Sequence, residues 1–263
     1  MIVPKAIAVI RKDALTAIRY RNGFVFRLFS PAAQLAAFYY LAQSVGSDFR
    51  PDGMPYFAFL VVGAGFYTFL IAGAHSLLRV IQESQQNGML EVLMTTATRP
   101  AALVTLSAIS AFGGSALEFV LYLFAAGFIA SGLRVHVAGL ASVFLLSAIT
   151  ALAIGLVAAA LQIAIHKGSA ALWLFGSGAW LLTGTMFPVQ VLPAPMRFIS
   201  TFLPFTHSLA AMRLALYPAQ RAISLGSEIE ILLAFAAVML PASVLFFSWT
   251  VRRARQLGTL SFY

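Results

Sequence analysis

The chain has 263 residues, of which 61% are apolar and only 10% are charged. An average soluble domain is about 45–50% apolar and about 25% charged. The chain therefore has too few polar residues to cover the surface of a soluble fold. A disordered chain would have few apolar residues and a high charge density, and this chain has the opposite composition. These values exclude both classes and indicate an integral membrane protein.

The reactive and charged residues narrow the function classes further. The absence of Cys excludes disulfides, thiolate metal sites and a cysteine nucleophile. The sequence has no GxxxxGK[ST], HExxH or GxSxG motif, so we expect no enzyme activity, cofactor or metal in this chain itself. Basic cytoplasmic loops and anionic headgroups explain the net charge of +9. Membrane lipids, and not nucleic acid, are therefore the expected partners of these charges.

Residues 1–23 do not form a signal peptide, because basic residues are scattered through the segment and no unbroken apolar core follows them. Apolar residues such as Ile7, Ile10 and Ile18 recur at helical spacing. This pattern predicts an amphipathic helix that lies in the membrane interface. An ordinary cytosolic lead-in helix is the alternative.

Six apolar segments are long enough to cross a bilayer, which takes about 20 residues. We therefore predict an all-α membrane fold with six transmembrane helices in one domain over residues 1–263. The predicted spans are 24–45, 56–80, 101–131, 137–165, 169–187 and 229–250.

Positively charged residues set the orientation, because they accumulate in cytoplasmic loops. With the N-terminus inside, twelve of the seventeen Lys and Arg residues fall on the cytoplasmic side. Both termini are then cytoplasmic, and the reverse orientation inverts this bias. The outer residues are Arg50, Arg134, Arg197, Arg213 and Arg221.

Residues 83–99 form a polar cytosolic loop that contains one short amphipathic helix. Such a helix is suited to insertion into a groove of a soluble partner. Leu90, Leu93 and Met94 would be its anchors, and Glu91 would pair with a basic residue of the partner. The alternative is a solvated loop whose apolar residues lie back on the membrane.

Residues 188–227 contain five of the eleven prolines, separated by apolar runs that are too short to span a bilayer. We predict a re-entrant hairpin at the outer face, covered by protein or lining a water-filled vestibule. Phe198, Phe202 and Phe205 are candidates for an outer gate.

Glu118 lies in the third predicted span, where an ionisable group is costly and is a functional candidate. It could line the path of a substrate or carry a proton in a secondary transporter. The alternative is a carboxyl near the interface or one paired with a backbone group.

Two segments resemble a known family. The run ESQQNGMLEVLMTTATRP at residues 83–100 resembles the "E…G-x-LE-x-L…T…P" cytosolic loop of ABC transporter permeases of the type-2 exporter family. Residues 184–213 resemble the "G…FP…LP…P-x-TH…R" region of the same family. The order of the motifs and the six-span layout also match, so the resemblance covers essentially the whole chain. Met89 departs from the pattern, because a small polar residue is common there.

The resemblance implies a transmembrane subunit without ATPase activity. Two copies, usually identical, would pair with two cytosolic ABC ATPase subunits, which would bind the ATP and Mg. The loop at 83–99 would couple to the ATPase, and the hairpin would lie at the outer face. The implied coupling residues are Glu83, Gly88, Leu90, Glu91, Leu93 and Met94. The implied hairpin and gate residues are Phe187, Pro188, Pro193, Phe198, Phe202, Pro204, His207 and Arg213.

Function and location follow as expectations. The resemblance implies an exporter, which we expect in the bacterial cytoplasmic (inner) membrane. The few charges in the spans and the short outer loops suit an amphiphilic, lipidic or drug-like substrate. Two alternatives remain: a proton-coupled secondary transporter that uses Glu118, and a structural membrane scaffold.

Overall fold

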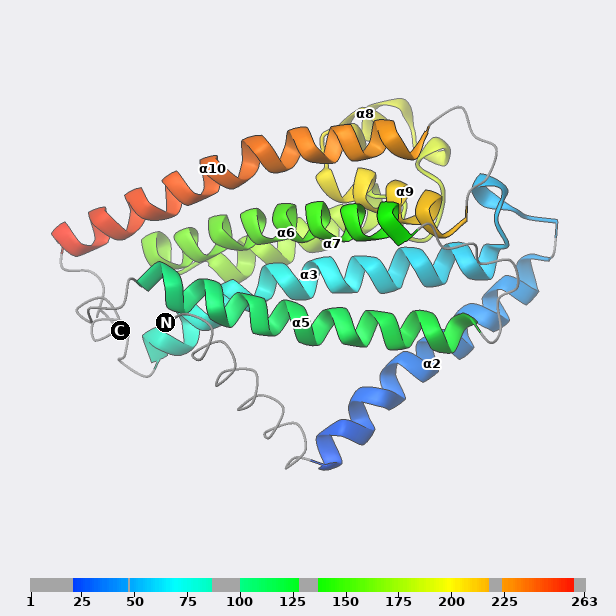
Figure 1. Ribbon diagram of the computed structural model, residues 1–263, viewed down its shortest axis with the longest axis horizontal. Helices are drawn as coiled ribbons and strands as arrows, with labels where there is room; N and C mark the ends of the chain where they lie inside the picture. Colours follow the sequence, from blue (N-terminus) through cyan, green and yellow to red (C-terminus); the bar gives the residue numbers. More distant parts are fainter. Residues whose placement is uncertain (1–20, 47, 87–99, 128–136, 218–223, 258–263) are drawn as a thin grey trace.

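The computed structural model describes residues 21–46, 48–86, 100–127, 137–217 and 224–257, and every regular element within these ranges is a helix. The predicted interface helix lies almost entirely outside the described residues. So does most of the predicted coupling loop. The long helices form an elongated bundle in which successive members run in opposite directions (Figure 1). They are α2 (Arg21–Val45), α3 (Tyr56–Gln86), α5 (Pro100–Gly127), α6 (Val137–Ile165), α7 (Gly168–Leu182) and α10 (Leu225–Leu257).

Each of these helices overlaps one predicted span, and three of them are long and apolar enough to cross a membrane. These three are Tyr56–Gln86, Val137–Ile165 and Leu225–Ala254. Within α5 the described apolar stretch is Phe112–Ala125, and α7 has only 15 residues. The predicted all-helical membrane fold is therefore confirmed for the described residues, whereas the six spans and the re-entrant hairpin stay predictions.

The central helix of the bundle is α3, which packs against α2, α5, α6, α7 and α9. Its residues are buried on nearly all sides, as expected for a helix that is apolar all round. Phe69 of α3 stacks with Phe119 of α5 and with Phe144 of α6, whose ring centroid is 4.4 Å away. Phe66 of α3 contacts the same two rings at a tilt. This aromatic cluster joins three helices in one apolar core.

Glycines allow the closest backbone approaches in the bundle. A Cβ atom built on Gly155 of α6 would lie 2.6 Å from the carbonyl oxygen of Ala74 in α3. A Cβ atom on Gly168, at the start of α7, would overlap the carbonyl oxygen of Ala158. Small residues at such crossings are typical of membrane helices, because close backbone contact supplies the packing energy there.

Two helix ends differ from the predicted boundaries. The second span was predicted to end at residue 80, but α3 continues to Gln86, so Glu83 lies on a helix and not in a loop. The side-chain amide of Gln82 donates to Ser169 at 2.6 Å, and Gln162 donates to Gln85 at 3.2 Å. These bonds to the α6–α7 region satisfy the polar residues that looked like a loop in the sequence.

The fifth predicted span was expected to reach residue 187, but α7 ends at Leu182. Gly184 has a φ of +75°, a conformation that favours glycine, and it turns the chain out of the helix. The apolar residues after it, including Phe187, belong to the link that leads into the following short helices.

Candidate functional site

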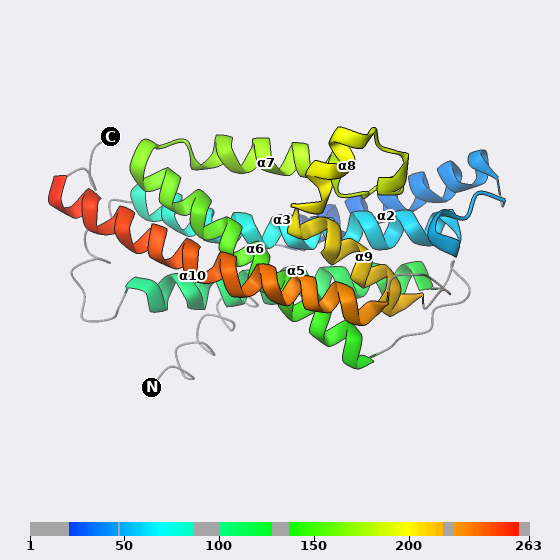
Figure 2. The ribbon, with the colours of Figure 1, turned by 90° about the horizontal axis from the view of Figure 1, so that it is seen from above.

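The segment between α7 and α10 folds into short helices at one end of the bundle (Figure 1). They are η2 (Val189–Val191), α8 (Ala194–Thr201) and α9 (Pro204–Leu216). Pro195 and Pro204 stand in the first turns of α8 and α9, where a missing backbone N–H costs nothing. Figure 2 shows α9 between α8 and α10. We call residues 183–216 the hairpin segment.

The two short helices differ in burial. Phe198 on α8 and Phe202, which directly follows α8, are 66% and 64% exposed, and their ring centroids lie 5.1 Å apart. On α9, most residues are buried against α3, α6 and α10. Phe198 and Phe202 therefore lie together on the exposed side, whereas the third gate candidate, Phe205, is buried in α9 against the rings of Tyr67 and Phe175. The helix α9 anchors the hairpin segment to the bundle.

Arg213 on α9 is buried, with only 3% of its surface exposed. Its guanidinium donates to the carbonyl oxygens of Gly184 at 2.9 Å, Thr185 at 3.2 Å and Phe59 at 3.3 Å. The guanidinium carbon also lies 3.5 Å from the centre of the Phe59 ring, which is cation–π geometry. One side chain thus joins α9, the turn after α7 and the start of α3.

This arrangement depends on the backbone around the guanidinium. A Cβ atom at Gly63 would overlap both the Arg213 guanidinium and the carbonyl oxygen of Thr185. The turn at Gly184 directs two successive carbonyls toward the same charge. Carbonyl oxygens and an aromatic face partly replace water around the buried cation. The geometry makes Arg213 a structural anchor of the hairpin segment.

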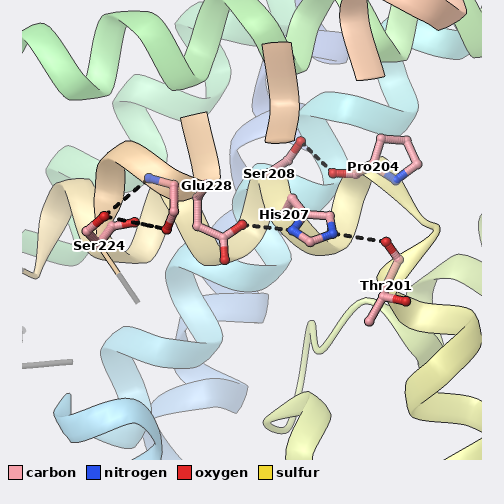
Figure 3. A network of polar contacts seen from close by, with 7 residues as sticks. Thr201, Pro204, His207, Ser208, Ser224 and Glu228 are labelled. Carbon is pink, nitrogen blue, oxygen red and sulfur yellow. Dashed lines mark hydrogen bonds and ion pairs between the residues drawn. The ribbon is translucent and has the colours of Figure 1, made fainter. Parts of the chain in front are cut away.

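His207 makes the second polar connection of the hairpin segment (Figure 3). Its Nδ1 lies 2.8 Å from Oε2 of Glu228, in the first turn of α10, and its Nε2 lies 3.0 Å from the carbonyl oxygen of Thr201, the last residue of α8. The two side chains are mostly buried, at 14% and 7% exposed. One imidazole therefore joins α8, α9 and α10.

Several effects act on the imidazole of His207. Burial lowers its pKa, whereas the hydrogen bonds to Glu228 and Thr201 and the charge of Glu228 raise it. The raising effects win, so the pKa of His207 lies above the ordinary value of 6.5.

Glu228 was not singled out in the sequence. The signal that could have found it is an acidic residue in the first turn of an apolar helix, where a carboxylate is stabilised by the helix dipole. Ser224 precedes this turn and its hydroxyl accepts from the Ser227 N–H at 3.2 Å, as a helix cap does (Figure 3). The missing information was spatial, because His207 is 21 residues away.

The other predicted hairpin residues shape the chain. Phe187 and Pro188 lie in the link before η2, and Pro193 directly precedes α8. Arg197 of α8 donates to the carbonyl oxygens of Gln190 at 2.8 Å and Leu192 at 3.2 Å, which closes the η2 turn. These residues build the turn and, unlike Arg213, they lie at its surface or are only partly buried.

The structure places Glu118 apart from these contacts, on α5. Its side chain is exposed on the same face as Leu117, Val120, Leu121 and Phe124, which are 50–67% exposed. This face points away from the partner helix α3. The carboxyl thus stands on an apolar surface, and its place on a substrate path stays a prediction.

Of the six predicted coupling residues, only Glu83 is among the described residues. It is exposed near the C-terminal end of α3, at the opposite end of the bundle from the hairpin segment (Figure 1). Gly88, Leu90, Glu91, Leu93 and Met94 lie outside the described residues, so their role stays a prediction.

The chain was compared with curated proteins and with models of protein families. No curated protein matches the chain. The family model described as "ABC-2 type transporter" matches residues 5–217, which is most of the chain and includes both motif regions. Together with the apolar helical architecture, this match shows a multi-pass membrane component of an ABC-type transporter. The chain belongs to the ABC-2 type transporter family.

Proposed function

We propose that the chain is the transmembrane subunit of an ATP-driven exporter that moves an amphiphilic, lipidic or drug-like substrate out of the cytoplasm or the inner leaflet. Two copies of the chain, with two cytosolic ABC ATPase subunits, would form the transporter. The observation that carries the proposal is the family match over residues 5–217 in a bundle of apolar helices. The chain itself would bind no nucleotide, and ATP and Mg would be held by the ATPase.

The distribution of charge supports a cytoplasmic location for the end opposite the hairpin segment. Arg79 of α3, Lys167 in the α6–α7 turn, and Arg252 and Arg253 of α10 all lie toward that end. Cytoplasmic loops are enriched in such residues. The hairpin segment then faces outward, as expected for six spans with both termini inside a bacterial inner membrane.

The helix α3 supplies a direct mechanical connection between the two ends. Its 31 residues correspond to a rod of about 46 Å at 1.5 Å per residue. At its start, the Tyr56 hydroxyl donates to the carbonyl oxygen of Met186 at 3.3 Å, and the carbonyl oxygen of Phe59 accepts from Arg213. At its other end it leads into the predicted coupling loop. A shift of that loop by the ATPase would therefore reach the hairpin segment through one stiff helix.

The docking prediction is tested by reversing the charge of Glu91. We expect the native chain, purified in mild detergent, to carry a soluble P-loop ATPase, and Glu91→Arg to lose it, because the reversed charge repels a basic residue of the docking groove. Mass spectrometry of the purified material is the measurement. Glu230→Arg is the matched control, since Glu230 is exposed near the hairpin end and its reversal should leave the ATPase bound.

The opposite result would contradict the proposed ATP-driven exporter. If the native chain is purified alone and still moves substrate in vesicles without ATP, it is not the subunit of an ATP-driven exporter.

The exposed carboxyl of Glu118 supports one alternative, a proton-coupled secondary transporter. Under the proposed function, Glu118→Gln should leave ATP-dependent transport in vesicles running, and a proton gradient without ATP should drive no transport in either the native chain or the variant. The melting temperature of the variant should equal that of the native chain, because the side chain is exposed. Transport that is driven by a proton gradient without ATP, and is lost in Glu118→Gln, would establish the alternative.

A further inference from the structure

The contacts of His207 require a definite number of protons. The carbonyl oxygen of Thr201 can only accept, so Nε2 of His207 must carry a hydrogen. The contact between Nδ1 and Glu228 also needs a proton, held either by the ring or by the carboxyl. The pair therefore holds two protons and is neutral overall in both arrangements. Removing one proton leaves a net charge of −1.

The singly protonated pair cannot keep both contacts. If the remaining hydrogen stays on Nε2, the lone pair of Nδ1 faces the Glu228 carboxylate and the two repel. If the hydrogen moves to Nδ1, the lone pair of Nε2 faces the carbonyl oxygen of Thr201 instead. In either case one of the two connections is lost, and the charge that remains is in a largely buried place.

Among the described residues, the elements around the pair supply no other charge to replace the lost proton. From α10, the groups near this end are Glu228, the exposed Glu230 and the ring of Phe235, whose centroid lies 5.8 Å from that of His207. From α8, Arg197 is engaged with the carbonyl oxygens that close the η2 turn.

The helices on the other sides of α9 are equally poor in charge. α6 has no ionisable residue, and the half of α3 nearest the hairpin segment carries only the phenols Tyr56 and Tyr67. On α9 itself, Arg213 is held by main-chain carbonyls. Glu228 is thus the charged group that acts on the ring.

We propose that His207 and Glu228 form a proton-dependent tie that positions α8 and the start of α9 against α10, and that loss of one proton from the tie frees α8 to move outward while Arg213 keeps the rest of α9 anchored. The tie joins the last residue of α8, the first turns of α9 and the first turn of α10 (Figure 3). If the proposed function holds, this movement opens the outer exit for the substrate. His207 and Glu228 would then be positioning residues and would not touch the substrate.

The direction of the pH dependence follows from the contacts. The pKa of His207 is raised above 6.5 in the folded chain. A group with a raised pKa stabilises the folded arrangement fully below its unfolded pKa and loses this contribution as the pH rises through its folded value. The tie should therefore be closed under acidic conditions and should open as the pH rises above the ordinary imidazole range.

The absence of Cys makes a direct measurement possible. Ile199 on α8 and Leu233 on α10 are 50% and 55% exposed, so both can be replaced by Cys and spin-labelled. Pulsed electron paramagnetic resonance in lipid nanodiscs measures the distance between the two labels. We expect a narrow distribution of this distance at about pH 6, and a second population at longer distance at about pH 9. The change should follow a one-proton curve centred above pH 6.5.

Glu228→Gln is the matched variant. The Gln amide can donate to a neutral Nδ1 or accept from a protonated one, so both contacts survive in either state of the ring. This variant should keep the narrow distribution at both pH values. His207→Ala should show the longer population at both.

The proposal fails if the native distribution is the same at both pH values, or if Glu228→Gln responds to pH as the native chain does. Because the native chain and Glu228→Gln decide the question, a misfolded His207→Ala variant would not block the test. The measurement uses the full chain without ATPase or substrate. A failure here is therefore separate from a failure of the ATPase to copurify.

Discussion

Replacing Arg213 by methionine is expected to lower the free energy of unfolding by about 3–5 kcal/mol, because three buried carbonyl oxygens lose a donor and each buried group left unsatisfied costs about 1–3 kcal/mol. Methionine keeps much of the side-chain length but cannot donate. The carbonyl oxygens of Phe59, Gly184 and Thr185 would lose the donor that they share in the native chain. The hairpin segment would then lose its anchor to α3.

Thermal unfolding in detergent, followed by size-exclusion chromatography, measures this loss. Arg197→Met is the control, because Arg197 also donates to two carbonyl oxygens but is exposed, and water can replace it. Arg213→Lys should recover only part of the stability, because an ammonium lacks the planar fork of donors. A melting temperature of Arg213→Met equal to that of the native chain would show that water already reaches these carbonyls.

Replacing Gly155 by leucine is expected to separate α3 from α6 and to destabilise the bundle by at least about 3 kcal/mol, at the upper end of the usual cost of overpacking. The obstacle is backbone and not a movable side chain. A Cβ atom at Gly155 would lie 2.6 Å from the carbonyl oxygen and 3.1 Å from the Cα of Ala74. Neither atom can move without moving α3.

Gly113→Leu provides the comparison for this prediction. Gly113 lies on the exposed face of α5, and a Cβ atom there would have nothing within 4 Å. Leucine also favours the helix by up to about 1 kcal/mol relative to glycine. We therefore expect unchanged or higher stability for Gly113→Leu in the same unfolding measurement. Equal melting temperatures for the two variants would contradict the close crossing of α3 and α6.

The apolar helices were predictable where hydropathy alone decides a boundary. The span predicted at 137–165 coincides with α6 (Val137–Ile165), because charged or turn-forming residues flank an uninterrupted apolar run. The end of α3 was missed because hydropathy treats polar residues as loop. Gln82 and Gln85 continue the helix through side-chain hydrogen bonds to residues that are 87 and 77 positions away.

The candidate site was predictable only in part. The motif that ends in His207 and Arg213 marked both residues, but not their partners. Arg213 bonds to Phe59, which is 154 residues earlier, and His207 pairs with Glu228, whose place in the first turn of an apolar helix does not indicate which residue it pairs with. Patterns in a single sequence show only local periodicity and composition. A pair of residues far apart in the chain changes neither of these, so it cannot be detected from the patterns.

The amino-acid sequence by itself determined the class of this protein. A 61% apolar composition and segments of bilayer length indicate an integral membrane protein, because a soluble fold could not bury so much apolar surface. The tertiary structure alone decided which polar groups meet: Arg213 with the carbonyls of three distant residues, and His207 with Glu228 and Thr201. The physical reason is that burial drives the apolar helices together without specifying partners, whereas each buried polar group must find the one arrangement that satisfies it.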